Sequence, residues 1–359
     1  MQNSLKSFLI CCLIVLISSA SHAQQKLKVV VAGLSHDHAH IIMNAYKTNS
    51  IELVGIAEAD ADLVERYRKS YKFSSDLVFK TLEEVLEVTK PDVVLAYNPV
   101  SEHVHVARIC MPKKIPVMVE KPLATTLKDA QEMAALSRKY NTPLLTNYET
   151  TWYSSIHSQK KLIEENADKI VRMAARDGHE GPKEIGCSTE FLNWLTQEET
   201  NGAGALYDFG CYGANIMTYF KNGEKPISVK ATTQQLKPGI YPDVDDDATI
   251  VLTYKDATGI IEASWSWPYS LKSFEVFGTQ NSYDAPDGNT LTQSERYTNP
   301  QEVTIQSDYF SNHIDYLTHY LNAETKPMND LSSLENNLIV VEILEAAKKS
   351  AKTGKTIKL

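Results

Sequence analysis

The sequence predicts an α/β protein of two domains: an N-terminal Rossmann-type, doubly wound parallel sheet and a C-terminal α+β domain with an open antiparallel sheet. Three observations predict it. Apolar runs alternate with amphipathic segments as far as residue 147, apolar and polar residues alternate in short stretches after residue 227, and 359 residues are enough for two cores. We therefore assign a leader to 1–23, a Rossmann-type domain to 24–147 and an α+β domain to 148–359.

The N-terminal domain repeats a strand–helix unit. Each helix begins after a polar residue and carries apolar residues at three- and four-residue spacing, which predicts right-handed β-α-β crossovers. The predicted strands cover 27–32, 51–57, 92–97, 115–119 and 143–146, and the predicted helices cover 40–47, 62–69, 81–88, 101–110 and 127–140.

The C-terminal domain has a different pattern. A helix over 154–167 precedes a long irregular stretch to residue 200, and a second helix covers 205–219. Period-two alternation predicts antiparallel strands with one open face over 227–235, 248–254, 258–266 and 273–279. A closing helix over 334–351, apolar at Leu338, Val341 and Leu344, is expected to pack back at the domain junction.

The first 23 residues have the composition of an export signal. Lys6 precedes an apolar stretch over 8–17, and the small-residue end Ser21-His22-Ala23 follows. The apolar stretch is too short to remain as a membrane span. We therefore expect a Sec-type signal peptide, a periplasmic or secreted protein, and no membrane association after cleavage.

The net charge bears on which partners the protein can bind, and the cysteines bear on whether disulfides hold its fold. Without the leader the chain has 35 basic and 45 acidic residues, so we expect no nucleic-acid partner. The three cysteines outside the leader, Cys110, Cys187 and Cys211, have no paired spacing. At most one disulfide can form, and the fold does not depend on a disulfide framework.

The tripeptide Glu120-Lys121-Pro122 follows the apolar run 115–119. It places a lysine at the carboxyl end of a predicted parallel strand, where open α/β sheets bind ligands. The bond before Pro122 tolerates the cis form, which would turn the lysine inward. An ammonium held there can hydrogen-bond a substrate hydroxyl and orient it for reaction. The alternative is an exposed lysine that precedes a helix.

The turn after the first strand reads Gly33-Leu34-Ser35-His36-Asp37-His38 and keeps only the first glycine of G-x-G-x-x-G. Ser35 and His38 occupy the other two glycine positions, where bulk hinders phosphate approach and helix packing. Support for a dinucleotide site comes from Glu58, which ends the next strand and is placed to bind a ribose diol. A carboxylate there favours NAD over NADP.

The residues His36, Asp37, His38 and His40 also suggest a metal site, because imidazole and carboxylate are ligands of zinc and other transition ions. Adjacent loop residues seldom converge on one ion. We therefore assign no metal ligands and keep the cluster as an alternative to pyrophosphate binding.

Further along the chain, residues 202–212 read Gly-Ala-Gly-Ala-Leu-Tyr-Asp-Phe-Gly-Cys-Tyr. With the strand–helix repeat, the Glu-Lys-Pro tripeptide and this segment in order, the chain resembles the Gfo/Idh/MocA family of oxidoreductases. In that family the Glu-Lys-Pro lysine lines the nicotinamide and substrate pocket, and a later helix carries an Asp followed four residues on by His or Tyr. Asp208 and Tyr212 match these positions. Four-residue spacing would put both on one helix face.

The resemblance implies hydride transfer between a sugar carbon and NAD, or NADP. Tyr212 would be the acid/base, Lys121 would lower the pKa of its phenol, and Asp208 would hold substrate hydroxyls. The expected cofactor-binding residues are Gly33, Ser35, His36, Glu58, Asn98, His103, Glu120 and Lys121. The expected substrate-binding residues are Lys121, His179, Trp194, Asp208 and Tyr212, and Trp265 and Trp267 offer further flat faces for a sugar.

The resemblance also implies a homo-oligomer that pairs through the C-terminal sheet.

Two functions other than sugar oxidation stay open at this stage. One is a redox-neutral, glycoside-cleaving enzyme that holds NAD tightly and returns the hydride in each turnover. The other is a metal-assisted or non-catalytic sugar-binding protein in which Ser35 and the histidines have replaced pyrophosphate recognition.

Overall fold

Short runs of Val, Leu and Ile form the central strands of the N-terminal sheet, and both faces of this sheet are covered by helices, as in doubly wound proteins. The computed structural model describes residues 26–305, 309–324 and 330–359, so the predicted leader lies outside the described residues. The six strands are all parallel, in the order β3-β2-β1-β4-β5-β6. They are β1 Lys28–Ala32, β2 Glu52–Ala57, β3 Val78–Phe79, β4 Val93–Ala96, β5 Val117–Glu120 and β6 Leu144–Asn147.

The helices of this domain begin at side chains that cap their free N–H groups. Asp60 accepts hydrogen bonds from two amides at the start of α2, and Thr81 forms a capping box with Glu84 at the start of α3. The helices are α1 Ala39–Lys47, α2 Ala61–Tyr71, α3 Leu82–Val88, α4 His103–Cys110 and α5 Leu127–Tyr140, with 3₁₀ turns at Ser75–Leu77, Val100–Glu102, Met111–Lys113 and Glu149–Trp152. All five predicted helices are confirmed.

The C-terminal domain is built on a nine-stranded sheet in the order β14-β13-β12-β11-β7-β10-β9-β8-β15. Its strands are β7 Ile170–Gly178, β8 Ser228–Gln234, β9 Asp247–Thr253, β10 Thr258–Ser264, β11 Leu271–Gly278, β12 Asn281–Ala285, β13 Thr292–Glu295, β14 Gln301–Glu302 and β15 Ile357–Lys358. Its helices are α6 Ser154–Glu165, α7 Thr189–Leu195, α8 Glu198–Asn201, α9 Ala205–Asp208, α10 Gly210–Phe220, α11 His313–Asn322 and α12 Leu334–Thr353.

The stretch predicted to be irregular contains β7, and that prediction is wrong. β7 lies near the centre of the sheet, parallel to β10 and antiparallel to β11, so the sheet is mixed. Its sequence carries two arginines and an aspartate among alanines, which is poor in the β-branched residues that mark strands. Pairing on both sides holds β7 in place, and a single sequence does not reveal that pairing.

The helix predicted over 205–219 is interrupted at Phe209, which separates α9 from α10. Asp208 therefore ends one helix and Tyr212 lies in the first turn of the next. The assumption of one continuous helix face was wrong, although both side chains still line one cavity.

The closing helix α12 packs at the domain junction, as predicted. Val341 belongs to the apolar cluster of the Rossmann-type domain, whereas Leu344 belongs to the cluster under the large sheet. Tyr316 and Leu317 of α11 also pack with the N-terminal domain, so this helix returns to it from the C-terminal region.

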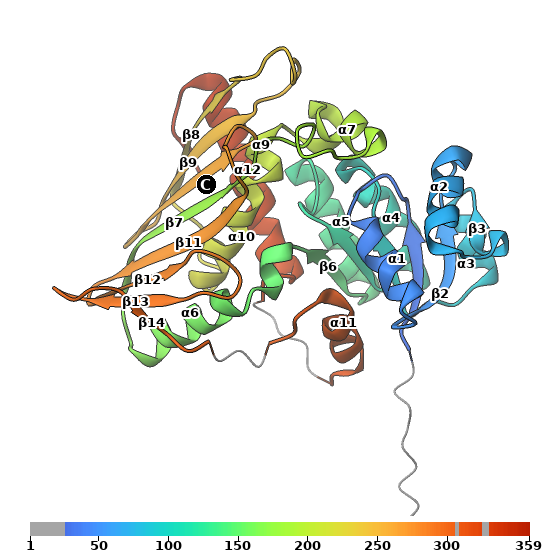
Figure 1. Ribbon diagram of the computed structural model, residues 1–359, viewed down its shortest axis with the longest axis horizontal. Coiled ribbons are helices and arrows are strands. Elements are labelled where there is room, and N and C mark those ends of the chain that lie inside the picture. Colours follow the sequence, from blue (N-terminus) through green and yellow to red (C-terminus); the bar gives the residue numbers. More distant parts are fainter. Residues whose placement is uncertain (1–25, 306–308, 325–329) are drawn as a thin grey trace, which may run out of the picture.

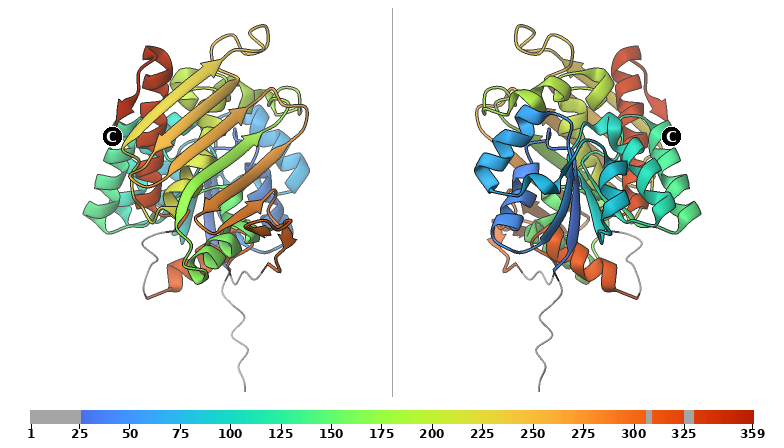
Figure 2. Two further views of the ribbon diagram at one scale, coloured as in Figure 1. Left: turned by 90° about the vertical axis from the view of Figure 1, so that its left-hand side faces the viewer. Right: turned by 90° about the vertical axis from the view of Figure 1, so that its right-hand side faces the viewer.

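One face of the nine-stranded sheet has no helix in front of it, whereas α10 and α12 lie behind the other face (Figure 2). Strand β9 shows the resulting alternation, because every second residue is buried. Within the described residues no helix has the length and apolarity needed to cross a membrane, and the three cysteines are free thiols.

Two buried histidines make the stability of this fold sensitive to acid. Burial lowers the pKa of His103 and of His313 from 6.5 to about 4. Between these values the unfolded chain binds more protons, so each histidine removes stability as the pH falls from 6.5 to 4. The loss is on the order of 3 kcal/mol per histidine.

We therefore expect the free energy of unfolding, measured in urea, to fall steeply between pH 7 and pH 4.5. His103→Gln keeps an amide donor for the Leu123 carbonyl but cannot titrate, so its stability should depend less on pH. An unchanged dependence in this variant would contradict the assignment to His103.

Candidate active site

Two cavities open at the carboxyl edge of the parallel sheet. The first, which we call the turn cavity, has a volume of about 480 Å³ and lies over the ends of β1, β2 and β4. Gly33, Ser35, Glu58, Asn98 and Trp194 line it. In a sheet of this order, the gap between β1 and β4 is the switch point at which ligands bind.

The turn between β1 and α1 requires its one glycine. Gly33 has a φ of +81°, and a Cβ there would lie 2.8 Å from the Cβ of Asn98. The carboxylate of Glu58 accepts a hydrogen bond of 2.9 Å from the backbone N–H of Leu34. Glu58 thus braces the turn while it lines the cavity, and its contact with a ribose stays a prediction.

The turn cavity fits a dinucleotide. The backbone N–H groups of Ser35 and Asp37 donate to no group in the described chain, and they lie just before α1, where a phosphate is stabilised. The Oδ1 atom of Asn98 is buried without a partner, although its amide donates to Glu102 at 3.2 Å. A bound ligand would satisfy these groups.

His103, predicted to contact the cofactor, lines neither cavity. It is fully buried, and its Nδ1 lies 3.2 Å from the carbonyl of Leu123. It therefore anchors the segment after the cis peptide bond between Lys121 and Pro122. We correct its role to a structural one.

The second cavity, the lysine cavity, has a volume of about 440 Å³ and lies between the two domains. It brings together the predicted catalytic residues Lys121, Asp208 and Tyr212 with His36 and His179. Its remaining walls come from the loops after β1 and β7, from Glu149 after β6, and from α7, α10 and β11. Charged side chains such as Glu149 and Lys272 line the cavity together with apolar ones such as Phe191, a mixture that suits a ligand with both hydroxyl groups and an apolar face.

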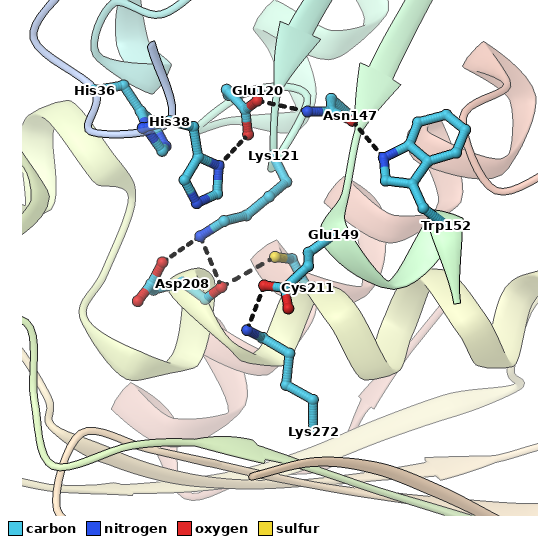
Figure 3. Close-up of polar contacts among 10 residues, drawn as sticks. All are labelled: His36, His38, Glu120, Lys121, Asn147, Glu149, Trp152, Asp208, Cys211 and Lys272. Atoms are coloured by element: carbon cyan, nitrogen blue, oxygen red, sulfur yellow. Dashed lines mark hydrogen bonds and ion pairs between the residues drawn. The ribbon is translucent and has the colours of Figure 1, made fainter. Parts of the chain in front are cut away.

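Lys121 and Asp208 form an ion pair across the domain boundary (Figure 3). The Lys121 Nζ donates to the Oδ1 of Asp208 and, at 3.2 Å, to its backbone carbonyl. The indole N–H of Trp265 donates to the Oδ2 of Asp208 at 2.8 Å. Lys121 is 6% exposed and Asp208 5% exposed, so all three groups are held in a largely dry site.

The pair stays charged. Burial lowers the pKa of Lys121, but the Asp208 carboxylate outweighs this effect and raises that pKa above 10.5. Burial raises the pKa of Asp208, but the Lys121 ammonium and the Trp265 N–H together bring it below 3.8. Both carboxylate oxygens of Asp208 are engaged, so its contact with substrate hydroxyls stays a prediction.

The prediction that Lys121 lowers the pKa of Tyr212 is wrong. Burial raises the pKa of this phenol well above 10, and nearby carboxylates raise it further. The Lys121 Nζ lies 5.3 Å from the centre of the Tyr212 ring and so meets its face. An ammonium at this distance does not offset the burial, so the phenol stays neutral and Tyr212 is a poor proton acceptor.

The predicted cluster of four loop residues does not converge. Asp37 accepts hydrogen bonds from the backbone and hydroxyl of Ser188, and His40 bonds the Tyr71 hydroxyl at 2.7 Å. Instead, His36 and His38 lie near Glu120, with one potential ligand atom of each within 4.8 Å of the others.

Other predicted substrate contacts differ in their placement. His179 lines the lysine cavity, where its Nδ1 accepts a hydrogen bond from the Gly181 N–H at 2.8 Å. Trp194 lines the turn cavity instead, and its indole donates to the Ser35 carbonyl at 3.3 Å. We therefore correct Trp194 from a substrate residue to one that closes the turn, and Trp265 from a sugar platform to the partner of Asp208.

Two charged residues of the lysine cavity, Lys272 and Glu149, were missed. Lys272 donates to Glu149 at 2.6 Å, and its ammonium lies 5.4 Å from the centre of the Tyr212 ring. Glu149 follows β6, so its place after a predicted parallel strand could have indicated it. Lys272 lies on a strand of the other domain, and no pattern in the sequence marks it.

Comparisons with known proteins agree with this geometry. A model of the oxidoreductase family's NAD-binding Rossmann fold matches residues 27–148, and a model of the GFO/IDH/MocA C-terminal domain matches residues 160–284. The crystal structure of an aldose-aldose oxidoreductase from Caulobacter crescentus, complexed with glycerol, superposes with a TM-score of 0.78 at 20% identity and covers 93% of this chain and 100% of that one.

Among characterised relatives, trans-1,2-dihydrobenzene-1,2-diol dehydrogenase of Danio rerio is 28% identical over 200 residues, which is 56% of each chain. The match thus spans little more than half the length of that relative. D-glucoside 3-dehydrogenase of Escherichia coli strain K12 is 21% identical over 362 residues, which is 95% of this chain and 99% of the relative. The two matched domains, in this order and around these cavities, show that the chain belongs to the Gfo/Idh/MocA family of oxidoreductases and carries its NAD-binding Rossmann domain.

Proposed function

We propose that this protein is an exported, NAD-dependent oxidoreductase that acts on a secondary alcohol, or the matching ketone, of a sugar or sugar derivative. The observation that carries the proposal is the buried ammonium of Lys121 in a cavity lined by both charged and apolar side chains, beside the dinucleotide-binding edge. Relatives named for aldose and glucoside support a carbohydrate as the substrate.

Lys121 acts on the oxygen of the reacting alcohol. Its remaining N–H can donate to that oxygen, and its positive charge stabilises the negative charge that develops there in the transition state. Asp208 fixes the ammonium, and Trp265 fixes Asp208, so little reorganisation is needed. A nicotinamide, when bound, supplies the two-electron acceptor for the hydride that leaves the carbon.

The walls of the lysine cavity select the substrate. His179, Glu149 and Lys272 present ring nitrogen, carboxylate and ammonium groups to the same space. Glu149 and Lys272 are paired, so their charges cancel and a neutral polyol fits better than an anion. Hydroxyl groups of a sugar can both donate to and accept from such a pair.

The proposed protein is exported and associates with a second copy of itself. The composition of residues 1–23 supports export, and an exported protein needs a dinucleotide that is held tightly and recycled. The open face of the nine-stranded sheet supports pairing with a second copy.

Two measurements test export and pairing. The N-terminal sequence of the exported chain is expected to begin at Gln24, and its mass in solution is expected to be that of an oligomer. A chain retained in the cytoplasm, or a monomer, would contradict them.

Lys121→Met should lower kcat for sugar oxidation by about 10³-fold or more, because it removes the donor to the reacting oxygen. NAD binding, measured by titration calorimetry, should persist because the turn cavity is intact. Lys128→Met, on the exposed surface of α5, is the matched control and should retain activity.

The single variant leaves the Asp208 carboxylate buried without its partner, which costs about 3–5 kcal/mol of stability. Lys121→Met/Asp208→Asn removes both charges and should regain part of that stability while it stays inactive. Wild-type turnover in either folded variant would refute the role of Lys121.

Glu58 should make the protein prefer NAD to NADP, because its carboxylate repels a 2′-phosphate at the ribose. We expect Glu58→Gln to keep the hydrogen bond from Leu34 and to bring the two dissociation constants closer together, by about tenfold. If the wild-type protein binds NADP as tightly as NAD, the ribose role of Glu58 is wrong.

A further inference from the structure

Oxidation of an alcohol releases a proton as well as a hydride, and none of the three predicted catalytic residues is suited to accept that proton. Burial raises the pKa of Tyr212, Lys121 is already protonated, and both carboxylate oxygens of Asp208 accept hydrogen bonds from Lys121 and Trp265. The other groups that line the lysine cavity are therefore candidates for the base. The inference that a base is needed rests on the proposed function.

His38 has the geometry of such a group. Its Nδ1 lies 3.0 Å from the Oε2 of Glu120, and its ring lines the same cavity as Lys121. The side chain is 32% exposed, whereas that of Glu120 is 2% exposed. Figure 3 shows the second ring nitrogen of His38 pointing away from Glu120. In the part of the chain that the structure describes, Nε2 has no hydrogen-bond partner.

Glu120 is itself fixed by two further residues. The Nδ2 of Asn147 donates to its Oε1 at 2.6 Å, and the indole of Trp152 donates to the Oδ1 of Asn147 at 3.0 Å. Asn147 ends β6, directly beside Glu120 at the end of β5. Burial raises the pKa of Glu120, but His38 and the Asn147 amide more than offset this and bring it well below 4.5. The carboxylate is therefore ionised.

An ionised carboxylate has no proton to give, so Nδ1 of His38 must be the donor. In the neutral ring this places the lone pair on Nε2, the nitrogen that is free. The backbone N–H of His38 also donates to the Nδ1 of His36 at 3.1 Å, which fixes the start of α1. The carboxylate thus sets both the orientation and the tautomer of the imidazole.

We propose that His38, oriented by Glu120, is the general base of this oxidoreductase. The O–H bond of the substrate breaks and its proton bonds to Nε2, while the electron pair of that bond forms the carbonyl. The hydride leaves the same carbon for the oxidised nicotinamide, so one alcohol is oxidised and one dinucleotide reduced. Glu120 stabilises the imidazolium that results, and ketone reduction follows the reverse path.

The proposal explains an irregularity in the dinucleotide turn. His38 occupies the third glycine position of G-x-G-x-x-G, where a side chain was expected to hinder close packing. Its ring instead turns toward β5 and reaches the substrate side of the sheet edge. The departure from the glycine pattern therefore supplies a reactive group at that edge.

The tautomer can be measured without turnover. Nitrogen-15 NMR of protein labelled at histidine should show His38 with its proton on Nδ1 at pH 7.5. Glu120→Gln, whose amide can either accept a proton from Nδ1 or donate one to it, should show a mixture of tautomers. A wild-type ring protonated on Nε2 would overturn the proposal.

Turnover gives the second test. His38→Ala should lower kcat by about 10²–10⁴-fold, with dissociation constants for NAD and sugar within about twofold of wild type. Added imidazole should restore part of the rate. His40→Ala is the matched control and should retain full activity, because the His40 ring lies two residues further on, contacts Tyr67 and Tyr71, and does not line the lysine cavity.

Full activity of His38→Ala would overturn the proposal. So would one transition-metal ion per chain that is removed by a chelator together with activity, because His36, His38 and Glu120 would then be metal ligands. If no sugar is oxidised by the wild-type protein, the proposed function fails and the NMR result still tests the His38–Glu120 pair. If sugars are oxidised but the tautomer is wrong, the function stands and the base lies elsewhere.

Discussion

The ion pair between Lys121 and Asp208 is the interaction on which the site depends, because its partners come from different domains. Lys121 follows β5 of the parallel sheet, and Asp208 ends α9 beside the mixed sheet. Removing two charges from water is costly, and their attraction compensates only where further hydrogen bonds complete the site. Trp265 supplies that bond to Asp208. The position of the ammonium therefore reports on the relative position of the two domains.

Much of this arrangement follows from sequence and elementary chemistry. Apolar runs and helical spacing predicted the central strands and all five helices of the Rossmann-type domain, and the carboxyl edge of that sheet predicted Lys121, Gly33 and Glu58 near ligand cavities. Local patterns carry this information, because a buried parallel strand and an amphipathic helix each leave a signature within a few residues.

The parts of the fold and site that the sequence did not predict depend on contacts between residues far apart in the chain, which leave no local pattern. β7 is held by two neighbouring strands, Lys272 reaches the cavity from the other domain, and Trp265 finds Asp208 across 57 positions of sequence. The error over Tyr212 has a physical cause. Proximity to a cation was inferred correctly, but the ammonium meets the ring face, and burial decides the protonation of the phenol. Charge alone does not determine pKa where water is excluded.

Helix α12 has a consequence for how the molecule unfolds. Its Val341 and Leu344 belong to separate apolar clusters, one in each domain, so a single rigid element completes both interiors. Loss of either cluster would expose the opposite side of the helix to solvent and weaken the other. The two halves of the polypeptide should therefore denature together in one cooperative transition, and neither half should persist alone when the chain is cut near residue 148.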